Sequence, residues 1–179
     1  MFLDESGFML QPLVQRSWAP RGQTPIIRCW DRRDRLSVIA AITVPPTRER
    51  FRLGAVFRIH PRNVKTTEAL MFLRALDRHI QGPMIVVQDR LNVHKAATTR
   101  WLARRSPKVP RVMVEWLPPY APDLNPTEQL WNHGKRGDLA NFAPADRHEL
   151  HDQVRRSLIR QRCRPKLLAS AFDHAGLPL

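Results

Sequence analysis

Two aspartates and one glutamate occupy positions, after apolar runs or a proline-rich stretch, from which a carboxylate can take part in catalysis. Asp4 follows the short apolar run 1–3, and Asp89 follows the apolar run 84–87 after a single glutamine. Glu128 comes at the end of a proline-rich stretch. Functional groups of open α/β sheets gather beyond the carboxyl ends of parallel strands. Each acid also has an ordinary interpretation, because a strand-end aspartate caps the next turn and Glu128 can complete a capping box with Asn125.

Three carboxylates that converge from two strand ends and one helix start can hold two divalent cations. Hard oxygen ligands of this kind suit Mg²⁺ or Mn²⁺. Two such ions, about 3.5–4 Å apart, activate the attacking oxygen and stabilise the leaving oxygen of an in-line displacement at phosphorus. No set of histidines and cysteines has the spacing of a zinc site. Asp4, Asp89 and Glu128 are therefore candidates for metal-assisted chemistry at phosphorus.

The elements of the first half are predicted to be strands. The run 1–3 ends in acids and is broken by Gly7. The apolar segments 26–30 and 36–44 flank the polar group 31–34, which indicates a hairpin. Apolar residues alternate with other residues over 51–59, the period of a strand with one buried face. This half is expected to form an antiparallel set.

The second half alternates strands with helices. Thr66 or Thr67 can cap a helix that ends at Gly82-Pro83, and the unbroken apolar run 84–87 predicts a strand buried on both faces. A helix over 95–105 and a strand over 112–117 follow, which implies parallel pairing with right-handed crossovers. Two more helices are expected, the first opening at Asn125 with Leu130 and Trp131 in the core, the second opening at Asp146. The result is one mixed α/β sheet with helices on both faces, the outline of a ribonuclease H-like domain.

The charge of the chain indicates a polyanionic partner. Thirty Lys and Arg oppose 16 Asp and Glu among 179 residues, and the basic residues recur along the whole length. A solvated basic surface is the alternative interpretation. No apolar run approaches the roughly 20 residues of a membrane span, and the two cysteines have no paired spacing. We expect a single cytoplasmic domain over residues 1–179, with reduced thiols and no membrane contact.

Four stretches, in this order, resemble the bacterial insertion-sequence branch of the mariner transposase superfamily, the insertion-sequence 630 type. They are Asp-Glu-Ser-Gly-Phe at 4–8, Trp-Ala-Pro-Arg-Gly-Gln-Thr-Pro at 18–25, Asp89 with His94, and the proline-rich stretch 117–128. The resemblance implies a ribonuclease H-like catalytic domain of the DDE type, with Asp4, Asp89 and Glu128 as the triad and two divalent cations, Mg²⁺ or Mn²⁺. It implies cleavage of DNA at transposon ends by water, followed by attack of the freed 3′-hydroxyl on target DNA.

The resemblance also names DNA contacts and partners. Members carry Asn after the second acid where Arg90 stands here, which alters a phosphate contact or marks a subgroup. Lys95, Lys135 and Arg136 are candidate phosphate contacts. His94 is equally well interpreted as a site residue or as an ordinary helix-terminal or surface histidine.

Family members begin with helix-turn-helix domains, so a chain truncated at its N-terminus is expected. A homodimer and a separately encoded helix-turn-helix polypeptide are then possible partners. A nuclease of this fold without strand transfer, and an inactive DNA-binding remnant, remain alternatives.

Overall fold

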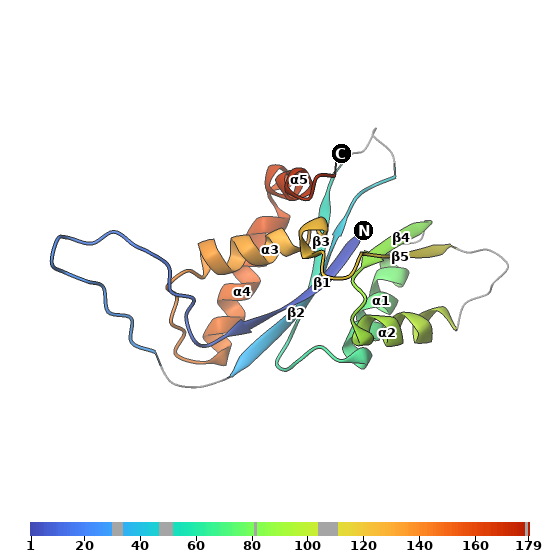
Figure 1. The fold of residues 1–179 in the computed structure, drawn as a ribbon. Coiled ribbons are helices and arrows are strands. Elements are labelled where there is room, and N and C mark those ends of the chain that lie inside the picture. The colour runs from blue at the N-terminus through green and yellow to red at the C-terminus, as the bar shows by residue number, and fades with distance from the viewer. Residues whose placement is uncertain (30–33, 47–51, 81, 104–110, 178) are drawn as a thin grey trace.

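A five-stranded mixed sheet forms the centre of the molecule (Figure 1). The computed structural model describes residues 1–29, 34–46, 52–80, 82–103, 111–177 and 179. The strands are β1 (Phe2–Met9), β2 (Arg35–Thr43), β3 (Gly54–His60), β4 (Met84–Gln88) and β5 (Val112–Trp116), in the spatial order β3-β2-β1-β4-β5. β1, β2 and β3 pair antiparallel, whereas β4 pairs parallel with both β1 and β5. This confirms the predicted change from antiparallel to parallel pairing.

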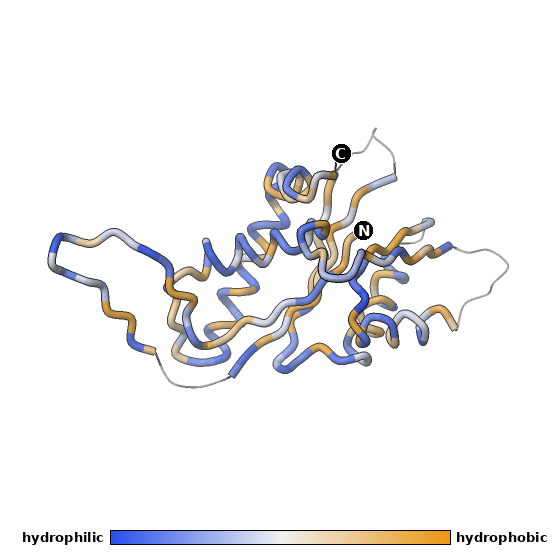
Figure 2. The backbone as a smooth tube through the Cα atoms, in the orientation of Figure 1, coloured by the Kyte–Doolittle hydropathy of each residue, from blue (hydrophilic) through white to orange (hydrophobic). Residues whose placement is uncertain are grey.

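Helices cover both faces of the sheet, and both groups of helices pack over β1 and β2. On one face lie α1 (Thr66–His79) and α2 (Asn92–Leu102), which pack over β1, β2, β4 and β5. On the other lie α3 (Glu128–His133), the π-helical turn η3 (Gly134–Asp138), α4 (Arg147–Arg162) and α5 (Pro165–His174), which pack over β1, β2 and β3. Figure 2 shows the hydrophobic residues concentrated along the central strands.

Alternation along β1 and β2 sends neighbouring side chains to opposite faces of the sheet. In β2, Ile39 packs with α1 and α2, whereas Val38 and Ala40 pack with α3, α4 and α5. In β1, Leu3 belongs to the α1–α2 side and Phe8 to the other side. The residues with even numbers in β1 therefore face α3 and η3, and those with odd numbers face α1 and α2.

The prediction that β4 is buried on both faces is wrong. Met84 and Val86 are buried against α1 and α2, but Ile85 is 51% exposed, and its partner Met113 on β5 is 57% exposed. The reason is that α3, α4 and α5 all pack over β1–β3, which leaves the second face of β4 and β5 uncovered.

The predicted hairpin around 31–34 is also wrong as far as the structure describes it. Residues 26–29 form no strand, and residues 30–33 lie outside the described ranges. β2 pairs instead with β1, through a connection that extends away from the body of the molecule (Figure 1). Gly7 does not break β1, since it pairs with Ser37 through the backbone, which needs no side chain. Phe51, the first residue of the predicted third strand, lies outside the described ranges.

The helix boundaries differ from prediction in three places. α1 is preceded by Lys65, whose N–H donates to the carboxylate of Glu68 (3.0 Å), so Thr66 and Thr67 lie inside the helix. α2 begins three residues earlier than predicted, and the end predicted at 105 lies outside the described ranges. α5 was not predicted, although Pro165 occupies its first turn, a position that suits proline.

The helix expected at Asp146 is confirmed. Its side chain accepts the N–H of Glu149 at 2.8 Å, and Leu150, Val154 and Leu158 are buried. Within the described ranges, no helix has the length and apolar character needed to span a membrane.

Candidate active site

Asp4 is a buried carboxylate in the central part of the sheet. It is only 6% exposed and faces α3, where Nε1 of Trp131 donates a hydrogen bond to Oδ2 of Asp4 (2.7 Å). Burial, and next the negative charge of Glu128, raise the pKa of Asp4 to about 7 against the hydrogen bond from Trp131. Trp131 and Leu130 are core residues as predicted, but Trp131 also orients Asp4.

Glu128 begins α3, and two hydrogen bonds fix this helix start on β1. Nδ2 of Asn125 donates to the carbonyl of Leu3 (3.1 Å), and Oγ1 of Thr127 donates to the carbonyl of Phe2 (2.8 Å). Leu3 precedes Asp4, so this attachment brings Glu128 close to Asp4. Both Asn125 and Thr127 are buried, so water does not compete for their two hydrogen bonds to β1.

The capping-box interpretation of Glu128 is wrong. The N–H of Asn125 donates to the carbonyl of Pro122 (2.9 Å), which closes the 3₁₀ turn Pro122–Leu124. Oδ1 of Asn125 accepts from the N–H of Thr127 (3.2 Å), and the N–H of Glu128 bonds the carbonyl of Asn125 (3.0 Å). The α-helix itself starts at Glu128 rather than at Asn125. The carboxylate of Glu128 is therefore not used in the cap.

Asp4 and Glu128 lie close enough to influence the ionisation of each other. Burial raises the pKa of Glu128, although a hydrogen bond with Asp4 and the charge of Lys135 act in the opposite direction. The negative charge of Glu128 disfavours ionisation of the buried Asp4, and a cation bound between the two groups would remove that cost.

Asp89 approaches the same region from β4. Phe2 of β1 stands beside Val87 of the parallel strand β4. The charge of Asp89, which follows β4, acts on both Asp4 and Glu128, so Asp89 lies near this pair. Oδ1 of Asp89 accepts the N–H of Leu91 (3.1 Å) and contacts Nδ1 of His94. Burial opposes the ionisation of Asp89, but the hydrogen bond and charge of His94 outweigh burial and lower its pKa. Asp89 therefore differs from Asp4, being ionised at a lower pH.

His94 joins Asp89 to a carboxylate that the sequence interpretation did not assign to the site. Its ring is 1% exposed, and Nε2 lies 3.1 Å from Oε2 of Glu5. Burial disfavours the charged ring, yet the two carboxylates raise the pKa of His94 to about 9. The interpretation of His94 as a surface histidine is thus wrong. The signal for Glu5 was its place next to Asp4 in a strand, which sends its side chain to the face of α2.

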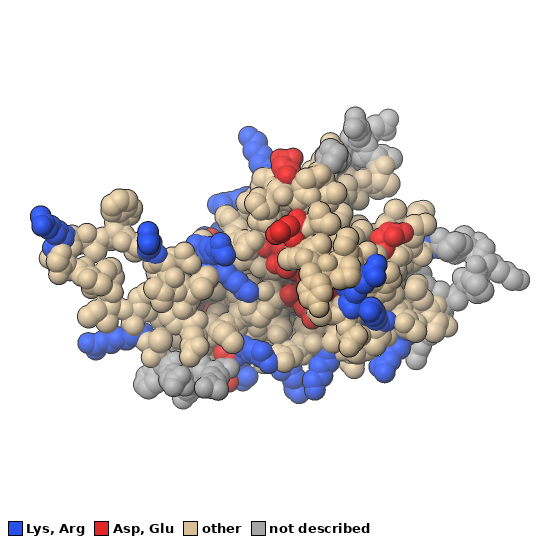
Figure 3. Space-filling model, in the orientation of Figure 1, with Lys and Arg blue, Asp and Glu red and all other residues tan. Residues whose placement is uncertain are grey.

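The four basic residues predicted to contact DNA divide into two kinds. Lys135 in η3 is half-buried, donates from Nζ to Oγ of Ser6 (2.7 Å), and lies 5.3 Å from the ring centroid of Phe8. Arg90, Lys95 and Arg136 are exposed, and in the part of the chain that the structure describes their charged groups form no ion pair. Figure 3 shows acidic side chains gathered near the middle of one face, with Lys and Arg side chains on either side.

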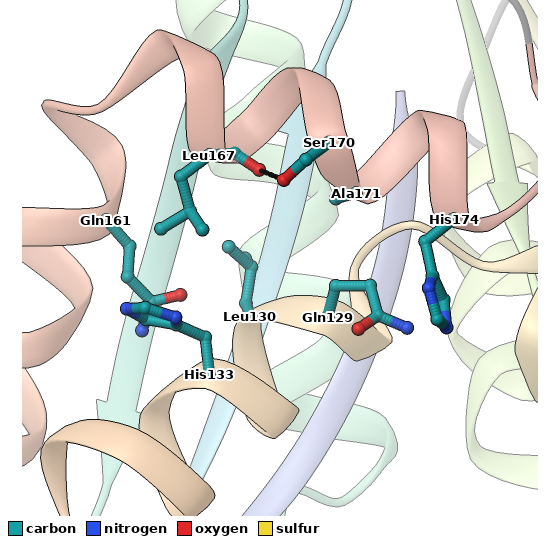
Figure 4. A pocket seen from close by; sticks show the side chains of 8 residues that line it. All are labelled: Gln129, Leu130, His133, Gln161, Leu167, Ser170, Ala171 and His174. Atoms are coloured by element: carbon teal, nitrogen blue, oxygen red, sulfur yellow. Dashed lines mark hydrogen bonds between the residues drawn. The ribbon is translucent and has the colours of Figure 1, made fainter.

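No metal cage is preformed in the described ranges, where no three acidic, histidine or cysteine side chains surround a common point. Asp4 and Glu128 approach each other, whereas Asp89 is engaged by His94. A separate cavity of about 300 Å³ lies among α3, α4 and α5 and contains none of these acids (Figure 4). It is lined by Gln129, Leu130, His133, Gln161, Leu167, Ser170, Ala171 and His174.

Comparison with known proteins decides the family. Residues 1–151 match the sequence family described as DDE superfamily endonuclease. The chain belongs to this family. The match extends from the first strand of this DDE endonuclease to the beginning of α4, so it includes all three acids. The predicted membership of the DDE endonucleases is confirmed.

Solved structures of the mariner transposase Mos1 share the fold. The Mos1 paired-end complex with the left transposon end has a TM-score of 0.66 at 16% identity over 97% of this chain and 51% of that chain. The Mos1 paired-end complex with Mn has a TM-score of 0.65 at 14% identity over 97% and 51%. The Mos1 strand transfer complex has a TM-score of 0.60 at 15% identity over 99% and 55%. The ribonuclease H-like fold predicted from the sequence is therefore confirmed.

This DDE endonuclease spans about half the length of the Mos1 chains that it matches. No curated protein matches it in sequence. The family and the fold are thus established, whereas the DNA substrate, the metal and the partners are matters for proposal.

Proposed function

We propose that this DDE endonuclease is the catalytic domain of a transposase, with Asp4, Asp89 and Glu128 as its catalytic residues. It would cleave DNA at the ends of a transposon and join the freed 3′-hydroxyl to target DNA. The main support is that Glu128 of α3 lies close enough to Asp4 of β1 to raise its pKa, and that the charge of Asp89, which follows β4, also acts on Asp4 and Glu128. The similar Mos1 structures include a complex with a transposon end and a strand transfer complex, which supports the same function here.

The chemistry of the donor set fits divalent cations. The buried carboxyl group of Asp4 and the half-buried one of Glu128 both have raised pKa values, which favours a proton or a cation near them. Asp4, Asp89 and Glu128 would hold two Mg²⁺ or Mn²⁺ ions, and the similar Mos1 paired-end complex with Mn supports this choice of metal. Bound in pairs, such ions stabilise the developing charges of an in-line displacement at phosphorus.

The residues of the chain then have separate tasks. Asp4 must lose its proton to act as a ligand, and because its pKa is raised, a cation would compete there with a proton. Trp131 holds Oδ2 of Asp4 in place (2.7 Å), which limits the ways in which this carboxylate can turn. In the first reaction water attacks the scissile phosphorus, the bond to the 3′-oxygen breaks, and a 3′-hydroxyl is released. In the second, that 3′-hydroxyl attacks a target phosphorus, the bond from that phosphorus to the target 3′-oxygen breaks, and the target strand leaves with a free 3′-hydroxyl.

DNA would lie across the acidic centre, with basic residues holding its phosphates. Lys135 is near Asp4 and Glu128 and is half-buried, so it is suited to a phosphate close to the reacting one. Arg90, Lys95 and Arg136 are exposed and suited to phosphates further along the strand. The net charge of +14 favours such binding at low salt.

The proposal extends to partners. Recognition of the transposon ends would come from a helix-turn-helix segment, on a separate polypeptide or in a longer form of this protein, and the active assembly would be a homodimer. We also propose that the protein belongs to the bacterial insertion-sequence branch and acts in the cytoplasm, where bacterial DNA lies.

The test is a joining reaction. A pre-cut duplex with an exposed 3′-hydroxyl, built from the terminal inverted repeats that flank the coding frame, is incubated with supercoiled plasmid and Mn²⁺. A transposase covalently joins the duplex to the plasmid, whereas a nuclease of the same fold only nicks the plasmid. Asp4→Asn and Glu128→Gln should abolish both products, and Asp152→Asn on α4 serves as the matched control. DNA binding without either product in Mg²⁺ or Mn²⁺ would assign the chain to an inactive remnant and refute the proposal.

A further inference from the structure

The side chains of Glu5 and His94 form a buried connection to Asp89 that the proposed reaction does not itself require. β1 directs Asp4 toward α3 and its neighbour Glu5 toward α2, because successive residues of a strand point to opposite faces. Glu5 therefore cannot join the pair of Asp4 and Glu128 on their side of the sheet. It lies instead beside the first turn of α2, which carries His94.

Both nitrogens of the imidazole ring are occupied by carboxylates. Nδ1 of His94 contacts Oδ1 of Asp89, and Nε2 lies 3.1 Å from Oε2 of Glu5. The ring is 1% exposed, so water does not compete for either nitrogen. A histidine held at both ends in this way has one orientation available, and it transmits that orientation to Asp89.

The Asp89 carboxylate is consequently oriented through one of its oxygens. Oδ1 accepts from the N–H of Leu91 (3.1 Å) and contacts His94. Within the described ranges Oδ2 of Asp89 accepts no hydrogen bond. The oxygen that remains for a ligand is therefore the one that His94 and Leu91 leave unused.

We propose that Glu5 and His94 are positioning residues, which hold Asp89 with Oδ2 directed to the site where Asp4 and Glu128 meet. The two adjacent acids of β1 then have different roles: Asp4 acts directly, and Glu5 acts through His94. The inference rests on the proposed function, since it concerns how one of the three acids is presented to a cation. Groups that orient metal ligands in this way change metal affinity or activity by about 10- to 100-fold when they are removed.

Four variants of the full 179-residue chain separate the contacts. Glu5→Ala removes the carboxylate that holds Nε2, and Glu5→Gln keeps an acceptor of the same length. His94→Asn keeps a donor near the position of Nδ1 and loses the contact with Glu5. The matched control is Asp152→Asn, which alters an exposed carboxylate–histidine pair (Asp152 Oδ1 to His151 Nδ1, 3.3 Å) on α4, a helix that carries none of these acids.

Two measurements are made on each variant. The first is the Mn²⁺ concentration that gives half of the maximal increase in Tm, measured without DNA. The second is the Mn²⁺ dependence of plasmid nicking, which separates half-saturation from maximal rate. We expect Glu5→Ala and His94→Asn to raise the half-saturating Mn²⁺ concentration by about 10-fold or more in both assays. Glu5→Gln should recover most of the loss, and Asp152→Asn should match the wild type.

Each outcome has one meaning. If the wild type neither binds Mn²⁺ nor nicks DNA, the proposed function fails. If the wild type does both and Glu5→Ala and His94→Asn keep its half-saturating Mn²⁺ concentration, the inference about Glu5 and His94 is wrong and the proposed function stands. If Glu5→Ala, Glu5→Gln and His94→Asn all fail to fold without metal, the connection serves stability, and the positioning role is also refuted.

Discussion

Replacing Asp4 with asparagine should stabilise the protein while it abolishes catalysis. In the folded chain this carboxyl is buried beside Glu128, and its pKa rises from 3.8 to about 7. Asparagine has the same shape, needs no proton, and still offers an oxygen to Nε1 of Trp131. Asp4→Asn thus removes an unfavourable charge without leaving an empty space.

The magnitude follows from the two pKa values. Asp4 binds its proton more tightly in the folded state than in the unfolded state. The unfolding free energy therefore falls as the pH rises from the pKa of the unfolded state to that of the folded state. The difference between 3.8 and about 7 corresponds to about 4 kcal/mol once the pH is above both. Structural relaxation reduces this, so we expect a gain of roughly 2–4 kcal/mol for Asp4→Asn at pH 8 and close to none at pH 4.

The assay is urea unfolding in EDTA, from pH 4 to pH 8, on the wild type, Asp4→Asn and the control Asp152→Asn. The difference in unfolding free energy between the wild type and Asp4→Asn should grow steadily with pH. At pH 8 it corresponds to roughly 4–16 °C in Tm for a domain of this size. Added Mn²⁺ should stabilise the wild type and leave Asp4→Asn unchanged.

A less stable Asp4→Asn at pH 8, or a difference that does not depend on pH, would refute the reasoning. Either result would mean that Asp4 is ionised without strain in the folded chain, and that its carboxylate is not held against Glu128. The control should differ from the wild type by no more than about 0.5 kcal/mol, the usual range for an exposed substitution.

Three further substitutions test the surrounding contacts. Asp89→Asn should destabilise the metal-free protein at pH 7, the opposite sign from Asp4→Asn. His94 lowers the pKa of Asp89, and the stability that comes from a lowered carboxyl pKa is present at neutral pH. Urea unfolding measures the change, and a gain in stability would contradict the prediction. Trp131→Phe keeps an aromatic ring in the core and removes the donor to Asp4, so the ionised carboxylate loses about 1.5–3 kcal/mol of hydrogen bonding. The half-saturating Mn²⁺ concentration in plasmid nicking should rise on the order of 10-fold. An unchanged value would disprove the role of this bond. Lys135→Met should weaken DNA binding equally for all sequences and reduce the slope of log affinity against log salt by about 1. Fluorescence anisotropy at several salt concentrations measures this slope, and an unaltered slope would exclude a phosphate contact.

The parts of the fold that were predicted correctly are those that local patterns determine. The apolar run that became β4, the alternation over β3 and the cap at Asp146 all depend on residues within a few positions of one another. The same holds for the change from antiparallel to parallel strands, since a helix between two strands leaves little room for any other pairing.

The errors lie where a distant partner decides the structure. Gly7 stays in β1 because a backbone ladder with β2 holds it, and residues 26–29 form no strand because β2 pairs with β1. The exposure of Ile85 depends on where α3, α4 and α5 pack, which no pattern within β4 reveals.

The same distinction between local pattern and distant contacts applies to the candidate site. The sequence alone determined that Asp89 follows a strand and that Glu128 begins a helix after prolines, because residue type and order carry that information. The prediction that Asp4 ends its strand is wrong, because pairing with β2 continues β1 to Met9. Only the tertiary structure decided that Asn125 and Thr127 attach this helix to β1, that Trp131 holds Asp4, and that His94 joins Glu5 to Asp89. The contacts of Asn125, Thr127 and Trp131 with β1, and of His94 with Glu5, join residues 89 to 127 positions apart in the chain. Burial and charge act between residues that are close in space. The pKa of each carboxyl group is therefore set by neighbours that the order of residues does not identify.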